Sequence, residues 1–318
     1  MAICSKTQNA TVIEVWELRR QARIVRVEVP GEYLTGGIVI SPDGEFVAGG
    51  SEAVSCWRVS DGHKVRTLGG DPAKEPLKAH AEIACEFSAD GRKLLTVDES
   101  GTIRVWEFLT GQLIRTFSGH NGPTTASFSA DARYIVGTSY DAPVFVWDVY
   151  GLKAPPPFSA ERVWNDLVDP SPEVAFRAVR ELCAAPREAV ALLKEKLGPE
   201  LIDTKAIDGW VKDLASDRFA DRERATAELE KQGESIATLL REALKASTNA
   251  EARNRLTAIL VRAERLSPAA LRFRRALDAL EHLETPEAKA HLEALGRGTP
   301  GCLRTVQAKE ALSRLSER

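Results

Sequence analysis

The feature that most constrains the fold is a tryptophan that recurs through the first half of the 318-residue chain. The four copies are Trp16, Trp57, Trp106 and Trp147, and successive copies are 41, 49 and 41 residues apart. Each lies near the end of a short run rich in β-branched residues, which is typical of a strand. A period of about 40–45 residues with four strands per unit is typical of a radial array of antiparallel sheets.

A second motif recurs in phase with the tryptophan. Residues 41–44, 88–91 and 129–132 have the sequences SPDG, SADG and SADA. Serine at the first position and glycine at the fourth favour a tight turn between antiparallel strands. Ala132 replaces the glycine in the last copy, so we expect slight strain in that turn.

These units resemble the WD-repeat (WD40) blades of β-propellers. The resemblance rests on Gly119-His120 at the start of a unit, on the S-x-D-G turn, and on Val146-Trp147-Asp148 at the end of a unit. It covers residues 2–150 and implies the fold of a propeller for this half of the chain.

The resemblance also implies a structural hydrogen-bonded network inside the last blade, formed by His120, Ser139, Asp141 and Trp147. We favour this structural role over a hydrolase triad, because the serine and the aspartate lie two residues apart on a turn and the chain has no G-x-S-x-G motif. In the third unit Ser100 stands where the aspartate is expected, with Asp98 two residues earlier. We therefore expect an incomplete or rearranged network there.

The strand pattern predicts about three and a half blades. The second unit is expected to have strands at 35–41, 45–50, 53–59 and 63–68, and the third at 82–88, 92–97, 102–108 and 113–117. The first and fourth units have room for three strands each. Propellers usually close with 4–8 blades, which leaves three explanations. The chain is the C-terminal piece of a longer propeller, it pairs with itself or another chain, or it is an open arc. The start in mid-blade favours the first.

The second half of the chain has a different pattern. A proline-rich linker at 153–158 separates the partial propeller, residues 1–152, from an α-helical domain at 159–318. Arg-Ala pairs at 177–178, 224–225 and 275–276 recur at spacings of 47 and 51 residues. This part resembles stacked HEAT or armadillo helices. The fold class is thus multidomain, with an all-β partial propeller followed by an all-α stack, and its overall texture resembles large WD-repeat proteins of some bacteria.

Composition argues against several functional classes. The net charge of −3 does not favour nucleic-acid binding. The five cysteines are far apart, and no signal peptide or membrane span is visible. We expect a cytoplasmic protein without a membrane segment, catalytic residues, cofactor or metal site.

Two further groups are assigned to the helix surface. His282 and His291 are expected at exposed polar positions rather than as metal ligands. A basic cluster is expected to form a solvated face paired with nearby acidic residues. Its arginines are Arg262, Arg265, Arg272, Arg274 and Arg275, and the acidic residues are Glu264, Asp278 and Glu281.

These observations favour a non-enzymatic scaffold that binds protein or peptide, with self-association as one means of completing the propeller. The binding residues cannot be identified, because such surfaces are assembled from loops of several repeats. The alternative is a regulatory or targeting part of a larger signalling enzyme whose catalytic domain lies outside this chain. A nonfunctional gene fragment is the third hypothesis.

Overall fold

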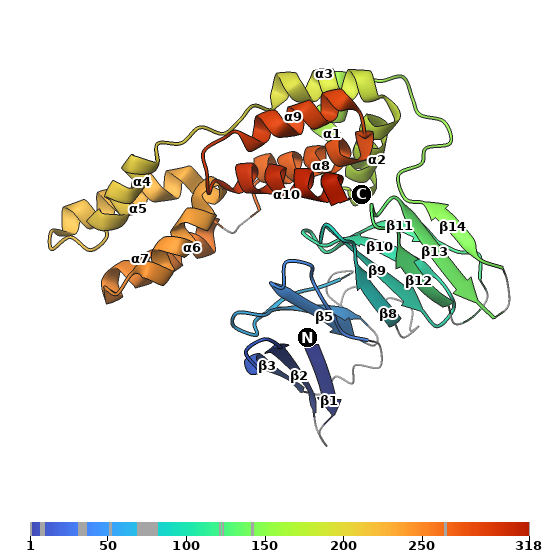
Figure 1. The fold of residues 1–318 in the computed structure, drawn as a ribbon, viewed down its shortest axis with the longest axis horizontal. Helices are drawn as coiled ribbons and strands as arrows, with labels where there is room; N and C mark the ends of the chain where they lie inside the picture. The colour runs from blue at the N-terminus through green and yellow to red at the C-terminus, as the bar shows by residue number, and fades with distance from the viewer. Residues whose placement is uncertain are drawn as a thin grey trace. The chain divides into compact units, whose positions relative to one another are not determined.

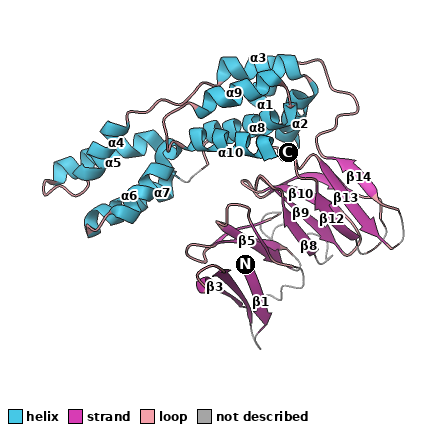
Figure 2. Ribbon diagram, in the orientation of Figure 1, coloured by secondary structure: helices cyan, strands magenta, loops and turns pink. Residues whose placement is uncertain are grey.

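The computed structural model describes residues 2–6, 10–30, 37–50, 53–68, 82–120, 122, 124–140, 143–263 and 266–317. The chain divides into two compact units, one of residues 1–151 with 171–173 and one of residues 152–170 with 174–318. The first unit contains strands and the second contains helices (Figures 1 and 2). This confirms the layout of antiparallel sheets followed by a helical region.

The described part of the first unit forms four small antiparallel sheets. Each sheet is a meander, in which strands that follow one another in the sequence pair with each other. The first sheet contains β1 (Ala2–Lys6), β2 (Ala10–Glu17) and β3 (Ala22–Pro30). The second contains β4 (Val39–Ile40), β5 (Phe46–Gly50), β6 (Val54–Arg58) and β7 (Lys64–Thr67). The third contains β8 (Glu82–Phe87), β9 (Lys93–Asp98), β10 (Ile103–Glu107) and β11 (Gln112–Phe117). The fourth contains β12 (Thr124–Phe128), β13 (Tyr134–Ser139) and β14 (Phe145–Asp148).

The pairing register repeats at the tryptophans. In each of the first three sheets the register shifts at the residue before the tryptophan, between Val15 and Trp16, Cys56 and Trp57, and Val105 and Trp106. A shift of this kind is a β-bulge, which increases the local twist of the strand. The sequence repeat is therefore also a repeat of backbone geometry.

The predicted turn between strands is built in the same way in three sheets. In the third sheet Ser88 Oγ donates to Asp90 Oδ1 at 2.5 Å, and the backbone N–H of Lys93 donates to Ser88 Oγ at 2.9 Å. The fourth residue, Gly91, has a φ of 68°. Equivalent bonds close the turns at 41–46 and 129–134. The serine and aspartate side chains thus satisfy backbone donors that the tight turn leaves unpaired.

Neighbouring sheets share core clusters in which the tryptophan takes part. We call the face that carries the tryptophan the leading face of a sheet, and the opposite face its trailing face. Trp57 and Val47 on the leading face of the second sheet form one core cluster with Ile13 and Val27 of the first sheet. A second cluster joins the leading face of the third sheet, around Trp106, to the second sheet, and its members are Ala48, Val54, Cys56, Leu68, Phe87, Leu94, Trp106 and Phe108.

The second unit consists of helices that begin after short turns. They are α1 (Ala160–Asp166), α2 (Pro172–Ala184), α3 (Pro186–Lys196), α4 (Thr204–Asp213), α5 (Phe219–Gln232), a 3₁₀ turn (Gly233–Ile236), α6 (Ala237–Ala246), α7 (Ala250–Ala263), α8 (Pro268–Leu283), α9 (Pro286–Gly296) and α10 (Leu303–Glu317). The side chains of Asp203, Ser267 and Thr285 accept hydrogen bonds from first-turn amides, as expected of N-caps.

The Arg-Ala repeat of the second half lies on three helices with the alanine side buried. Ala178 of α2, Ala225 of α5 and Ala276 of α8 are at most 1% exposed. The leucines four residues later, at 182, 229 and 280, are buried to the same degree. Small and large apolar residues on one side of a helix let neighbouring helices pack closely.

The two histidines are not where the sequence analysis placed them. His282 and His291 are each only 5% exposed, so the expectation of exposed polar positions is wrong. His282 Nδ1 lies 2.8 Å from the backbone oxygen of Asp278, one helical turn earlier on α8. The helix supplies a polar partner for a ring that packing with α9 and α10 removes from water.

The arginines of the predicted basic cluster also do not share one solvated face. Arg275 is buried and donates to the backbone oxygen of Leu167 at 2.7 Å. Arg272 lies over the ring of Trp164, and Arg274 pairs with Glu234 at 2.5 Å. Their spacing along α8 distributes them around the helix, so each arginine contacts a different neighbouring segment. Glu264 and Arg265 lie outside the described residues.

Candidate functional site

The predicted network of the last unit is described for three of its four members. His120 is 4% exposed, Ser139 and Trp147 are partly buried, and Asp141 lies outside the described residues. The His120 ring contacts Phe145 and Trp147 edge to face, with centroids 4.8 and 6.1 Å away. The hydrogen-bonded network itself stays a prediction.

In the third sheet an aspartate organises the corresponding hairpin. Asp98 is fully buried and accepts hydrogen bonds from Ser100 Oγ at 2.5 Å, from the Thr102 amide at 3.0 Å and from Arg104 at 2.8 Å. Burial acts to raise the pKa of Asp98, but these hydrogen bonds outweigh it and leave the pKa below its ordinary value. The carboxylate therefore stays charged and holds the turn between β9 and β10.

The tryptophan of this sheet is held separately from the aspartate. Trp106 is 2% exposed, and its Nε1–H donates to Thr96 Oγ1 at 2.9 Å. In the fourth sheet the position ten residues before the tryptophan is Gly137. A Cβ there would lie 2.7 Å from the Trp147 ring, so the glycine provides room for the ring. These contacts are packing contacts within and between the sheets.

A repeated arginine links each of two sheets to the next. Arg66 of the second sheet donates to the backbone oxygens of Phe108 and Leu109 in the third. Arg115 of the third sheet donates to the backbone oxygen of Val149 beyond β14, at 2.8 Å. We call Arg66 and Arg115 the linking arginines.

The sequence analysis missed the linking arginines, although a signal was present. Each stands nine residues after its tryptophan, in the segments VRTL at 65–68 and IRTF at 114–117. The positions of their acceptors, two or three residues after the next tryptophan, repeat as well. Only the structure shows that these two sets of positions meet.

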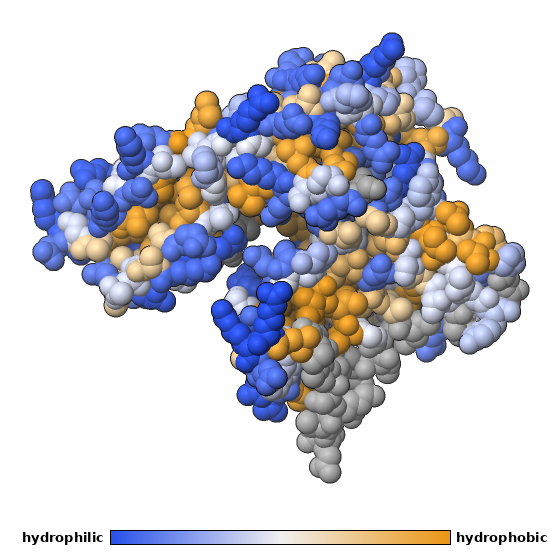
Figure 3. Space-filling view, viewed as in Figure 1, coloured by the Kyte–Doolittle hydropathy of each residue, from blue (hydrophilic) through white to orange (hydrophobic). Residues whose placement is uncertain are grey.

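The trailing face of the fourth sheet exposes large apolar side chains. The exposed fractions are 39% for Tyr134, 40% for Val136, 59% for Val144 and 62% for Val146. Tyr140, at the end of β13, is fully exposed. Apolar surface is visible over β14 in Figure 3. A contiguous apolar patch of this kind is typical of an interaction site.

The leading face of the first sheet has the opposite character. Trp16 there is partly buried, and its Nε1–H lies 3.3 Å from Glu14. Glu14 pairs with Arg23 at 2.7 Å, and Arg26 pairs with Glu28 at 2.8 Å. This face is therefore charged where the trailing face of the fourth sheet is apolar.

The second unit contains a groove between α4 and α6. Its volume is about 320 Å³. It is lined by Thr204, Ile207, Asp208, Val211, Leu239, Glu242, Ala243 and Ala246. Apolar surface lies between the α4–α5 and α6–α7 hairpins in Figure 3. The groove thus combines an apolar floor with acidic side chains at Asp208 and Glu242.

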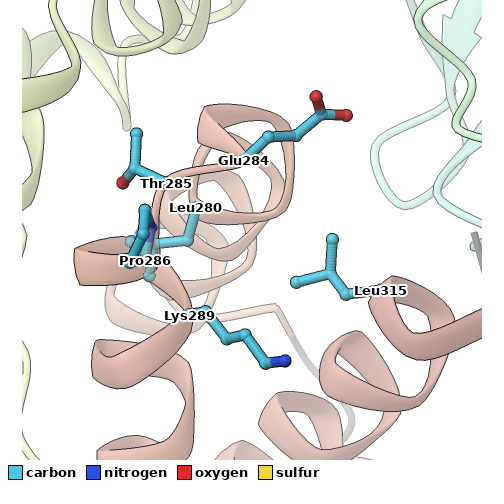
Figure 4. A pocket seen from close by; sticks show the side chains of 6 residues that line it. All are labelled: Leu280, Glu284, Thr285, Pro286, Lys289 and Leu315. Carbon is cyan, nitrogen blue, oxygen red and sulfur yellow. The ribbon is translucent and has the colours of Figure 1, made fainter.

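A second hollow lies where the end of α8 meets α9 and α10. Its volume is about 470 Å³. Figure 4 shows the six side chains around it: Leu280, Glu284, Thr285, Pro286, Lys289 and Leu315. It carries one cation, one carboxylate and one hydroxyl, and no cysteine or histidine is among its lining residues.

The described ranges show no site for a metal ion. They contain no cluster of three or more His, Cys, Asp or Glu side chains placed to hold a metal ion. Burial raises the pKa of Cys56 to about 12 and that of Cys302 to about 11, so both stay protonated at neutral pH. None of the helices described has the length and apolar character needed to cross a membrane.

Comparison with known proteins places the repeats in a family. The model of the WD40 family (WD domain, G-beta repeat) matches residues 70–107 and 111–148. An uncharacterized WD repeat-containing protein of Synechocystis is 36% identical over 104 residues, which are 31% of this chain and 28% of that protein. The LST8 homologue of Drosophila melanogaster is 30% identical over 108 residues, 33% of this chain and 34% of that protein.

A guanine nucleotide-binding protein subunit beta of Zea mays is 22% identical over 148 residues, 44% of this chain and 39% of that protein. The chain thus spans less than half the length of each of these relatives. The residues matched by the family model contain the third and fourth sheets. The chain therefore carries WD repeats in its first unit.

Proposed function

We propose that the chain is a non-enzymatic protein-interaction scaffold of the cytoplasm. In this proposal residues 1–152 form about three and a half propeller blades, residues 153–158 are a linker, and residues 159–318 are a HEAT-like helical stack. The carrying observation is that one turn repeats in the second, third and fourth sheets, and that the third and fourth sheets lie in the residues matched as WD repeats. Such arrays present binding surfaces assembled from several repeats.

The α4–α6 groove is the proposed partner site of the second unit. Ile207, Val211 and Leu239 provide an apolar floor, and Asp208 and Glu242 lie at the edge. An amphipathic helix from a protein partner fits such a groove, with apolar residues at positions i, i+3, i+4 and i+7. Basic residues beside its apolar face would complement the two carboxylates.

Affinity purification with the full tagged chain tests this proposal. The wild type is compared with Val211→Lys in the groove and with Val261→Lys, a control at a 60% exposed position of α7. Circular dichroism establishes that all three are folded. We expect a protein retained by the wild type and the control but lost with Val211→Lys, and a measurable dissociation constant with that protein purified. The proposal would be overturned if none of the retained proteins binds the purified chain saturably.

A further inference from the structure

We infer that the trailing face of the fourth sheet docks the same face of a second copy of the chain. The inference rests on the proposed scaffold function and specifies one of its partners. It also specifies which face of the sheets is involved. There are three reasons. This face is exposed, its centre carries no charge, and the other outer face, the leading face of the first sheet, carries ion pairs.

The same positions are covered in the preceding sheet. The registers pair Val146 with Val136 and, in the third sheet, Val105 with Leu95, so these two pairs are equivalent. Leu95, Val105 and Ile103 have no exposed surface. Their counterparts Val136, Val146 and Val144 are 40–62% exposed. The fourth sheet thus repeats a face that is buried one sheet earlier, but its described side chains are exposed.

The face carries no charged side chain at its centre. Cross-strand pairing places Thr125 opposite Thr138 and Ser127 opposite Val136, all on the same side of the sheet. Thr125 and Thr138 bond to each other, with their Oγ1 atoms 2.8 Å apart. The face is therefore formed by hydroxyl-bearing and β-branched residues, with Tyr134 on β13.

Charge is found only at the margins of the described face. The guanidinium of Arg133 lies 5.7 Å from the ring centroid of Tyr134. Asp148 ends β14, and its carboxylate accepts from the amides of Tyr150 and Gly151 at 2.9 and 2.8 Å. Asp148 lies opposite Tyr134 across the strands, so it stands at the end of this face and not opposite Val136 or Val146.

On the trailing face of the third sheet, which the fourth sheet covers, two charged side chains contact residues of the covering segment. There Glu86 and Lys93 occupy the positions of Ser127 and Tyr134. Glu86 accepts from the Phe128 amide at 3.4 Å, and Lys93 Nζ lies 5.0 Å from the ring centroid of Tyr150. Both partners belong to the covering segment. The fourth sheet has replaced these two ionic groups with neutral ones, so its cover needs no complementary charges.

Among the described residues, a second copy could be contacted through the leading face of its first sheet or through the trailing face of its fourth sheet. The leading face of the first sheet carries the Glu14–Arg23 and Arg26–Glu28 pairs. Covering them with an uncharged face would remove ions from water without new partners, which is costly. The trailing face of the fourth sheet carries charge only at its margin, at Arg133 and Asp148, and its uncharged centre matches itself. Two such faces can stack about 10 Å apart as in a β-sandwich, and a pair of identical patches is the usual form of a two-fold dimer.

Light scattering after size exclusion, over a hundredfold range of concentration, tests the inference on the full chain. We expect the wild type to form a dimer. Val146→Lys should weaken dimerisation by about a hundredfold or more, because it places a cation in an apolar contact. The gentler Val146→Thr keeps a β-branched side chain and should weaken it by about tenfold. The matched control is Ile24→Lys, at a 51% exposed position of the first sheet, which should leave dimerisation unchanged.

Three outcomes would overturn the inference. They are a wild type that is monomeric at every concentration, a dimer that survives both Val146 substitutions in folded variants, and a dimer that Ile24→Lys disrupts as strongly as Val146→Lys. Failure of the scaffold function is observed separately. A monomer that still retains a protein through the α4–α6 groove contradicts the dimer alone, whereas a dimer that retains no protein contradicts the groove-based function alone.

Discussion

At the scale of single residues, Ala132 in the turn at Ser129–Ala132 keeps the backbone conformation of the repeat although it is not a glycine. Ala132 has a φ of 56°, in the left-handed region that Gly44 and Gly91 occupy in the equivalent turns. Its amide donates to the Ser129 oxygen at 2.8 Å, as the Gly91 amide does to Ser88. A left-handed conformation costs a residue with a Cβ roughly 1–2 kcal/mol. The strain expected from the sequence thus has a geometric basis.

Ala132→Gly should stabilise the protein by about 0.5–1 kcal/mol, the relief of strain less the entropy that glycine adds to the unfolded chain. Urea denaturation measures the change. Gly91→Ala is the reciprocal control and should destabilise the protein, because its backbone is left-handed. The atom nearest to a new Cβ, Pro42 Cδ, is 3.5 Å away, so the cost comes from backbone strain and not from a clash. The same sign for both substitutions would contradict the argument.

Asp98 is a buried residue whose charge contributes to stability. Because its folded pKa lies below the unfolded value of about 3.9, its contribution is fully present above that pH. The contribution is lost as the pH falls through the folded pKa. Asp98→Asn removes the charged acceptor of Arg104 and should destabilise by about 3 kcal/mol at pH 7.

The difference between wild type and Asp98→Asn should shrink as the pH falls below about 4. Denaturation midpoints at pH 7 and pH 3 measure it. Asp61→Asn serves as the control, since its carboxylate is about half exposed and its pair with Arg58 is at the surface. A pH-independent difference for Asp98→Asn would show that the carboxylate acts through shape rather than charge.

At the scale of elements, the linking arginines explain how one sheet holds the next. Burial lowers the pKa of Arg115, and its guanidinium lies over the Phe117 ring while it donates to Val149. One end of the side chain therefore belongs to β11 and the other end to the segment after β14. A main-chain acceptor suits this contact, because it depends on the position of the backbone and not on the residue there.

Arg115→Met should destabilise the first unit by about 1.5–3 kcal/mol, the value of a hydrogen bond to a charged group. Chemical denaturation followed by tryptophan fluorescence measures it. Arg20→Met is the control, because Arg20 is 79% exposed and its pair with Glu17 is a surface one. We expect a change within about 0.5 kcal/mol for the control. Equal effects of the two substitutions would show that the link between sheets carries no particular stability.

At the scale of the whole molecule, the two units have separate cores and separate repeats. In the first unit the sheets depend on one another, because Trp106 of the third sheet packs in a cluster with Cys56 and Val54 of the second. In the second unit the helices α4 to α7 share a cluster of their own around Leu229 and Leu256. Each of these two clusters consists of residues of one unit.

Trp106→Ala should therefore destabilise the first unit by about 3–5 kcal/mol while most of the helical signal is kept. Near-ultraviolet circular dichroism and fluorescence follow the sheets, and ellipticity at the helical band follows the second unit. The sequence predicts the same loss for Trp147→Ala, but Trp147 is only partly buried, so we expect a smaller effect. If the substitution abolished the sheet signals and the helical ellipticity together, the expectation that the two cores unfold independently would be wrong.

The sequence by itself determined the local features of this protein. The tryptophan spacing and the S-x-D-G turns predicted the strands of the second and third sheets, and the switch to helical periodicity predicted the helical region. These are short-range patterns, in which a residue and its near neighbours in the chain carry the whole signal. The tertiary structure decided which faces meet: it buried His282 and His291, placed Arg66 and Arg115 against the next sheet, and left Val144 and Val146 exposed while Ile103 and Val105 are covered. Burial depends on what packs against a face, and that neighbour is set by contacts between distant segments, which no local pattern records.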